Sequence, residues 1–144
     1  MGALDGVRIL DLSRILAGPW ATQMLADLGA DVVKIEADWG DDTRKWGPPF
    51  IGEDAAYFHA CNRGKRSMVL DLKSKEGMET LRQLIGCADV VVENFRTGTL
   101  ERLGIDTDTF GDKILCRITG YGQTGPRATE PGYDIALQAM SGIM

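Results

Sequence analysis

The feature that most constrains this chain is a repeated alternation between short apolar runs and helical stretches. The apolar runs are rich in Val, Ile and Leu and have the lengths of buried strands. They cover residues 7–12, 31–36, 68–72, 90–93 and 114–119. Strands that alternate with helices favour a parallel sheet with helices on its faces. The sequence therefore predicts an α/β fold built on a mostly parallel sheet.

Helix start and stop signals fill the spaces between these runs. Gly18-Pro19 breaks the chain before a predicted helix over residues 20–28, and Pro suits a first helical turn because its missing N–H needs no partner there. Ser74 is a candidate N-cap for a helix that ends near residue 85. A last helix is expected from Tyr133 to the end of the chain.

Length and charge set the first limits on function. A chain of 144 residues is long enough for one compact domain. Its formal net charge of -5 argues against a nucleic-acid partner, because such proteins usually present a basic face. No apolar run is long enough for a membrane span, and the first residues lack the pattern of a signal peptide. We therefore expect no membrane partner.

The cysteines and the single histidine exclude other kinds of site. Cys61, Cys87 and Cys116 are widely spaced and form no C-x-x-C motif. His59 has no second histidine with which to complete a zinc site, so no metal is expected. This cysteine usage is typical of reduced proteins, which predicts a cytoplasmic location.

Basic residues gather next to the predicted strands. Ligands of parallel sheets bind beyond the carboxyl ends of the strands, and Arg or Lys in such places often binds phosphate. The residues concerned are Arg63, Lys65, Arg66, Lys73, Lys75, Arg96 and Arg102. Any single one of them is more often a solvated surface charge. Their clustering in an acidic chain favours a phosphorylated ligand.

The segment Asn94-Phe95-Arg96 combines an amide, an aromatic face and a guanidinium after one strand. Such a group can stack on a base and bind a phosphate. Alternatively, Phe95 belongs to the core and Asn94 to a turn, and spacing alone leaves both interpretations open. The chain shows neither the G-x-G-x-x-G fingerprint after its first strand nor a Walker A loop.

The long connection over residues 37–66 holds Trp39, Trp46, Tyr57 and Phe58. Long irregular connections in compact domains are often functional. The alternative is that these aromatic residues form a small satellite cluster under the loop.

Eight short motifs resemble, in order, those of the family III CoA-transferases of the CaiB/BaiF type. They are LDGVRILDLS at 4–13, AGP at 17–19, DLGADVVKIE at 27–36, NRGKRS at 62–67, LDLK at 70–73, ADVVVENFR at 88–96, GYGQTGP at 120–126 and PGYD at 131–134. The resemblance implies a Rossmann-like domain with helices on both faces of its sheet. Residues 1–144 would then be the N-terminal, CoA-binding part of a longer family chain.

The same resemblance implies a set of CoA contacts. By position they are Leu16, Ala17, Leu70, Asp71, Leu72, Lys73, Asn94, Phe95, Arg96 and Arg102. Tyr133 and Asp134 fall at the acyl end of the family's site. A family arginine at the nucleotide end is replaced here by Ala37, and Arg44 is a candidate substitute.

The family's mechanism uses an Asp carboxylate that attacks the acyl-CoA thioester and later carries CoA itself. The resemblance places that Asp after Met144, so no catalytic residue is expected in this chain. It implies CoA and acyl-CoA as substrates rather than a tightly bound cofactor, a carboxylic acid as acceptor, and an interlocked homodimer.

Two alternatives to a transferase remain. The related 2-methylacyl-CoA racemases use a histidine at the position of Tyr133, where a phenol is a poor base at neutral pH. This substitution favours transfer of CoA between carboxylic acids. The second alternative is a truncated, non-catalytic CoA-binding module.

Overall fold

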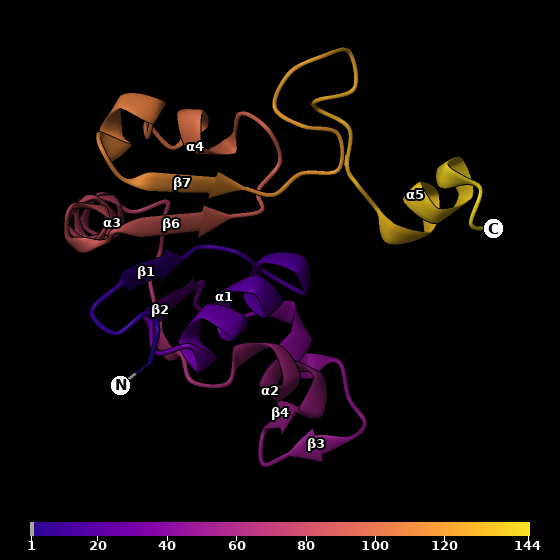
Figure 1. The fold of residues 1–144 in the computed structure, drawn as a ribbon, viewed down its shortest axis with the longest axis horizontal. Coiled ribbons are helices and arrows are strands. Elements are labelled where there is room, and N and C mark those ends of the chain that lie inside the picture. The colour runs from indigo at the N-terminus through magenta and orange to yellow at the C-terminus, as the bar shows by residue number, and fades with distance from the viewer. Residues whose placement is uncertain (1) are drawn as a thin grey trace.

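A five-stranded parallel sheet forms the centre of the computed structural model, which describes residues 2–144 (Figure 1). Its strand order is β5-β2-β1-β6-β7, and every pairing within it is parallel. The bounds are β1 Arg8–Asp11, β2 Asp31–Glu36, β5 Arg66–Val69, β6 Val90–Glu93 and β7 Ile114–Arg117. The predicted parallel α/β sheet is therefore confirmed.

Helices and short elements connect these strands. The helices are α1 Ala17–Asp27, α2 Ala56–Asn62, α3 Lys75–Cys87, α4 Thr99–Arg102 and α5 Asp134–Ser141. Two 3₁₀-helices, η1 Asp42–Lys45 and η2 Thr107–Phe110, and a small antiparallel pair, β3 Phe50–Ile51 with β4 Asp54–Ala55, complete the chain. None of the helices over residues 2–144 has the length and hydropathy that a membrane crossing requires.

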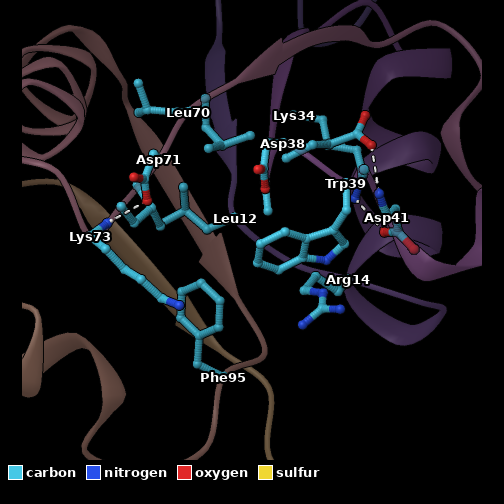
Figure 2. A pocket seen from close by; sticks show the side chains of 15 residues that line it. Leu12, Arg14, Lys34, Asp38, Trp39, Asp41, Leu70, Asp71, Lys73 and Phe95 are labelled. Atoms are coloured by element: carbon cyan, nitrogen blue, oxygen red, sulfur yellow. Dashed lines mark hydrogen bonds and ion pairs between the residues drawn. The ribbon is translucent and has the colours of Figure 1, made fainter.

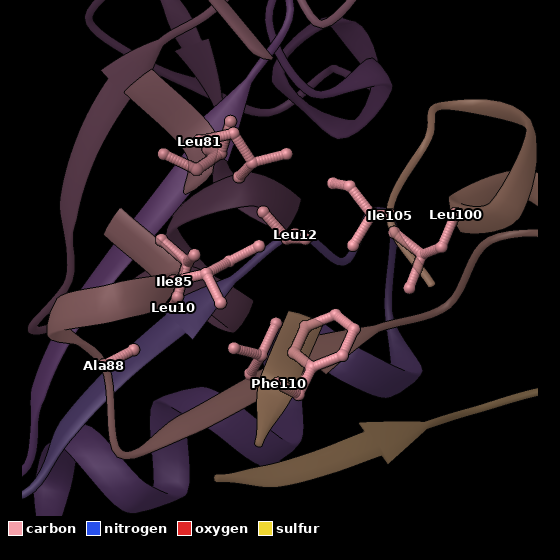
Figure 3. Close-up of a cluster of buried hydrophobic side chains, with 10 residues drawn as sticks. Leu10, Leu12, Leu81, Ile85, Ala88, Leu100, Ile105 and Phe110 are labelled. Carbon is pink, nitrogen blue, oxygen red and sulfur yellow. The ribbon is translucent and has the colours of Figure 1, made fainter. Parts of the chain in front are cut away.

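The two faces of the sheet are covered by different helices, because side chains alternate along each strand. On one face Ile9, Val32 and Val92 pack with residues of α1. On the other face the core of Figure 3 joins strand residues such as Leu10 to Leu81 and Ile85 of α3. The prediction of helices on both faces is confirmed.

Helix α3 begins as its sequence predicts. Ser74 is the N-cap, and its Oγ accepts a hydrogen bond from Gly77 N at 2.9 Å. This bond satisfies one of the N–H groups left over at a helix start. The apolar face of α3 then packs against one face of the sheet.

The third predicted strand is misplaced. β5 begins at Arg66 and ends at Val69, whereas the apolar run predicted residues 68–72. The chain turns earlier because the side chain of Asp71 accepts from Lys73 N at 2.9 Å and its carbonyl accepts from Ser74 N. Asp71 therefore lies in the turn before α3 and not in a strand.

The last predicted helix is too long. α5 ends at Ser141, and Gly142 follows as its C-cap with φ of 81°, a left-handed conformation that glycine adopts without strain. The expectation of a helix that continues to Met144 is wrong. α5 projects from the rest of the fold at the end of a long connection (Figure 1).

The connection between β2 and β5 is structured rather than irregular. It contains η1, the β3–β4 pair and α2. Trp46 and Tyr57 meet edge to face with ring centroids 5.5 Å apart, and Phe58 is buried. Trp46 and Tyr57 match the alternative of a small satellite cluster, whereas Phe58 packs against the Arg44 guanidinium and Trp39 is 54% exposed.

Candidate functional site

The strand order creates a topological switch point between β1 and β6. From β1 the chain proceeds outward through β2 to β5, and from β6 it proceeds to β7 on the opposite side. Ligands of open parallel sheets bind in the crevice beyond the carboxyl ends of the strands at such a point. The loops after β1, β2, β5 and β6 are therefore the place to look for a site.

A cleft with a volume of about 170 Å³ lies at this edge and is open to solvent, and we call it the main cleft (Figure 2). Its lining residues come from all four of these loops and strand ends. They are Leu12, Arg14, Lys34, Ile35, Glu36, Ala37, Asp38, Trp39, Gly40, Asp41, Leu70, Asp71, Leu72, Lys73 and Phe95. Figure 2 shows Trp39 and Phe95 on opposite sides of the open space. Aromatic and leucine walls with cations from Arg14 and Lys73 suit a nucleotide.

A second hollow, which we call the side hollow, adjoins the main cleft and shares Phe95 with it. It is lined by Ala17, Asn94, Phe95, Thr97, Ile118, Thr119, Gly120, Ala128, Glu130, Gly132 and Leu137. Gly120 and Gly132 touch through their backbones, so a Cβ on either would collide with the other. The hydroxyl oxygen of Thr97 is buried and has no hydrogen-bond partner within the described chain.

The structure gathers most of the positions that the family resemblance singles out. Leu70–Lys73 and Phe95 line the main cleft, and Ala17 and Asn94 line the side hollow. Leu16 is exposed directly before Ala17, as the N-cap of α1. Their contact with CoA stays a prediction.

Four other positions lie exposed, outside the lining of both hollows. Arg96 follows Phe95 on the surface, and Arg102 at the end of α4 donates to Thr99 Oγ1 at 2.8 Å. Tyr133 is 61% exposed before α5, and Asp134 accepts from Gln138 Nε2 at 2.6 Å. The structure does not bring these four together with the cleft residues.

Several basic residues near strand ends have internal partners. Arg63 and Arg66 form exposed ion pairs with Asp27 and Asp31 at 2.6 and 2.7 Å. Both arginines therefore match the alternative that these basic residues are solvated surface charges. Of the basic residues named from the sequence, Lys73 is the one that lines the main cleft.

Arg44 does not take the place of the arginine missing at Ala37. Its guanidinium lies 2.6 Å from Glu36 and 2.7 Å from Asp54, and 3.7 Å above the ring of Phe58. Hydrogen bonds to Glu36 raise the pKa of Arg44 further above its already high value. Beside Ala37 the main cleft is instead lined by Trp39 and Arg14, which are not among the CoA contacts that the family resemblance implies.

Buried charges lie beneath the main cleft. The side chains of Lys34 and Lys65 are only 1% and 2% exposed. Lys34 Nζ lies 3.0 Å from Asp41 Oδ2, and Lys65 Nζ lies 2.9 Å from Asp11 Oδ2. Because an unpaired buried charge is strongly destabilising, each lysine depends on its carboxylate.

The protonation of these groups follows from burial and pairing. Burial alone would raise the pKa of Asp41, but the Lys34 ammonium and the Thr43 donors outweigh it, so the pKa lies below 3.8. Burial lowers the pKa of Lys65, and the Asp11 carboxylate opposes this only in part.

Glu93, the last residue of β6, fixes the backbone at Phe95. Its Oε2 accepts from Phe95 N at 2.6 Å, and its Oε1 accepts from Arg117 Nε at 2.8 Å. Burial opposes the charge of Arg117, but hydrogen bonds to Glu93 and Glu101 raise its pKa overall. Phe95, which lines both hollows, is thus fixed by a hydrogen bond to the last residue of a sheet strand.

Over residues 2–144 no three His, Cys, Asp or Glu side chains are arranged to hold a metal ion. The main cleft has apolar and aromatic walls, with both cations and carboxylates among its lining residues.

The comparisons with known proteins agree with this picture. Residues 4–144 match the family model described as CoA-transferase family III. The chain is 54% identical to the succinate–glutarate CoA-transferase of Agrobacterium fabrum and 48% identical to the succinyl-CoA:glutarate CoA-transferase of Mus musculus. These matches cover 98% and 100% of this chain, which spans 38% and 34% of the two relatives' lengths.

A solved structure agrees with the fold as well. The crystal structure of a CaiB/BaiF family protein from Brucella suis superposes with a TM-score of 0.94 at 53% identity. The match covers 99% of this chain and 40% of the other. The chain therefore belongs to the family III CoA-transferases, as its ordered motifs predict.

Proposed function

We propose that this chain is the CoA-binding part of an enzyme that moves CoA between two carboxylic acids. The observation that carries the proposal is the family match over residues 4–144, on a fold whose switch-point cleft gathers Leu70–Lys73 and Phe95. Relatives that are 48–54% identical carry the names of CoA-transferases. The enzyme acts on CoA thioesters and needs no tightly bound cofactor.

The two hollows suit the two ends of CoA. The adenosine end occupies the main cleft, where Trp39 offers an exposed indole face and Lys73 offers a cation for phosphate. The pantetheine arm passes Phe95 and enters the side hollow. There the unpartnered hydroxyl of Thr97 can bond to an amide or carbonyl of the arm.

The covalent step needs a carboxylate, and the family resemblance implies that this Asp lies outside residues 1–144. Asp11 and Asp41 are buried in ion pairs, so neither can reach a thioester. We place the nucleophilic Asp in a part of the enzyme outside residues 1–144. Its attack on the thioester carbonyl breaks the C–S bond, releases CoA thiolate and forms a mixed anhydride. The thiolate then attacks the aspartyl carbonyl, and the donor acid leaves.

Short dicarboxylic acids are the proposed donor and acceptor. The names of the two relatives above specify succinate and glutarate. The test is to incubate the complete protein that contains this chain with succinyl-CoA and glutarate. Glutaryl-CoA and succinate should form in equal amounts. Their absence, together with CoA release into water, would reject the transferase.

Incubation of the complete protein with a 2-methylacyl-CoA and a free carboxylic acid in D₂O tests the racemase alternative. Tyr133 stands at the position of the racemase histidine, so deuterium should not enter the α-carbon of a 2-methylacyl-CoA. Rapid deuterium exchange at the α-carbon without transfer of CoA would show a racemase instead of a transferase. Residues 1–144 alone should give no turnover and no covalent acyl or CoA adduct.

The active form is proposed to be a homodimer. Every residue of α5 is at least partly exposed, and Ile135 and Met140 present large apolar side chains to solvent. Such apolar surface favours contact with another part of the enzyme or with a second copy. Light scattering of the complete protein should give twice the chain mass.

A further inference from the structure

Ile15 has an unusual backbone conformation. Among residues 2–144 it is the one non-glycine residue with positive φ, at 70°. A β-branched side chain strains the left-handed region, and such strain persists only where the surroundings enforce it. Ile15 lies between β1 and α1, directly before Leu16 and Ala17, so its conformation sets the direction of the residues that face the CoA site.

A buried ion pair enforces this conformation. Asp41 Oδ2 accepts a hydrogen bond from Ile15 N at 3.2 Å and lies 3.0 Å from Lys34 Nζ. Lys34 Nζ also donates to the carbonyl oxygen of Ser13 at 2.7 Å. The loop is thus held on both sides of Arg14, by an acid that receives one N–H and a lysine that binds one carbonyl.

The pair itself is fixed in place. Asp41 Oδ1 accepts from Thr43 N at 3.0 Å and from Thr43 Oγ1 at 2.7 Å. The backbone N–H of Asp41 donates to Glu36 Oε2 at 2.8 Å, and Arg44 holds that carboxylate in turn. With these bonds both carboxylate oxygens of Asp41 are used, and the pair cannot shift without breaking several of them.

We infer that Lys34 and Asp41 are positioning residues, which hold the Ile15 loop in its strained shape so that the CoA site is formed before the ligand arrives. The inference rests on the proposed CoA site. A buried ion pair is a poor source of stability, since apolar residues of similar size often serve as well. Holding a strained loop beside a ligand gives this pair a role that apolar residues cannot fill.

The first test measures CoA affinity in the complete protein that contains this chain. Asp41→Asn removes the charge that attracts Lys34 and turns an N–H donor toward Ile15 N. The Kd for CoA should rise by about tenfold or more, because a small displacement of a positioned group has large effects. Ile9→Ala, a core change at the start of β1 and outside the lining of both hollows, is the matched control: it lowers Tm and leaves the Kd unchanged.

A rescue separates positioning from simple stability. Glycine adopts φ near 70° without strain, so Ile15→Gly needs no ion pair to hold it. Added to Asp41→Asn, it should restore most of the CoA affinity while Tm stays low. Should Asp41→Asn fail to fold, Lys34→Met with Asp41→Leu leaves no unpaired charge, and this double variant should also bind CoA more weakly and be rescued by Ile15→Gly.

A measurement without ligand separates the claim that the ion pair holds the Ile15 loop from the claim that the site binds CoA. Hydrogen exchange at the Ile15 amide should speed up in Asp41→Asn and stay slow in Ile9→Ala, whether or not CoA binds. A lower Tm with unchanged Kd and unchanged Ile15 exchange would overturn the inference. If the unaltered protein fails to bind CoA, the proposed function is wrong, and the exchange result still decides whether the pair holds the loop.

Discussion

The side-chain amide of Asn94 pairs with the backbone of Arg14 through two hydrogen bonds. Asn94 Oδ1 accepts from Arg14 N at 2.8 Å, and Asn94 Nδ2 donates to Arg14 O at 2.7 Å. This pairing joins the loops after β1 and β6 across the switch point. Asn94 therefore fixes the two loops relative to each other, and one N–H and one lone pair of its amide remain for a ligand.

Breaking this pairing should weaken both the fold and the site. In Asn94→Asp the carboxylate can accept from Arg14 N but cannot donate to Arg14 O. We expect the free energy of unfolding to fall by about 1–2 kcal/mol and the Kd for CoA to rise. Urea unfolding and calorimetry measure the two effects. Gln83→Glu, an exposed amide change on α3, should alter neither, and an unchanged Kd in Asn94→Asp would contradict this role.

Trp39 should report CoA binding directly. Its indole is 54% exposed on the wall of the main cleft, whereas Trp46 is 49% exposed against Tyr57. Stacking of a base on an aromatic ring contributes about 1–3 kcal/mol. Trp39→Ala should therefore weaken CoA binding with little loss of stability.

The fluorescence of Trp39 and Trp46 supplies the control. CoA should quench emission in a Trp46→Phe variant and should quench it much less in a Trp39→Phe variant. The opposite result would place the base outside the main cleft.

Arg96 and Arg102 test the positions that resemblance alone assigns. Both are exposed, so their substitution by Ala should leave stability almost unchanged. Charge-assisted contacts to phosphate contribute about 1.5–3 kcal/mol, and CoA affinity should fall accordingly. Lys75→Ala at the start of α3 is the control. A larger loss in Lys75→Ala than in either arginine variant would show that the phosphates lie elsewhere.

Acid should destabilise the protein through Glu36 and Asp41. Burial alone would raise the pKa of Glu36, but hydrogen bonds from Arg44 and Ser67 outweigh it and the pKa lies below 4.5; the pKa of Asp41 likewise lies below 3.8. Folding therefore lowers both pKa values. Their contribution to stability is complete above these ordinary values and is lost as the pH falls below them.

Urea titrations at a series of pH values check this dependence. Glu36→Gln should reduce the loss of stability below about pH 4.5, because the group no longer titrates. Glu79→Gln, an exposed change on α3, should leave the pH dependence as it is. Equal pH dependence in the unaltered protein and in Glu36→Gln would contradict the assignment.

The sequence predicts the framework of the fold because apolar periodicity and caps are local signals. Ser74 and the apolar face of α3 are of this kind. The end of β5 and the end of α5 are missed because single hydrogen bonds and a left-handed Gly142 decide them. The order of the strands depends on contacts between distant segments, which a single sequence does not display.

The candidate site is predicted only in part, for a similar reason. The family resemblance singles out LDLK and Phe95, and both line the cleft, although the apolar run wrongly placed Leu70–Leu72 inside a strand. Lys34 has the appearance of a surface charge within a strand, and its burial is explained by Asp41 and the Ser13 carbonyl, which lie on other segments. The strained Ile15 leaves no sequence signal, because its conformation comes from the pair of Lys34 and Asp41.

The most direct test of this account is calorimetry of the complete protein with CoA, NAD and ATP. The main cleft lies at a switch point without the dinucleotide glycine fingerprint, and it is lined by Trp39, Lys73 and Phe95. CoA should bind at least about tenfold more tightly than NAD or ATP, a difference of about 1.4 kcal/mol. Equal or tighter binding of NAD would contradict the claim that this cleft is a CoA site.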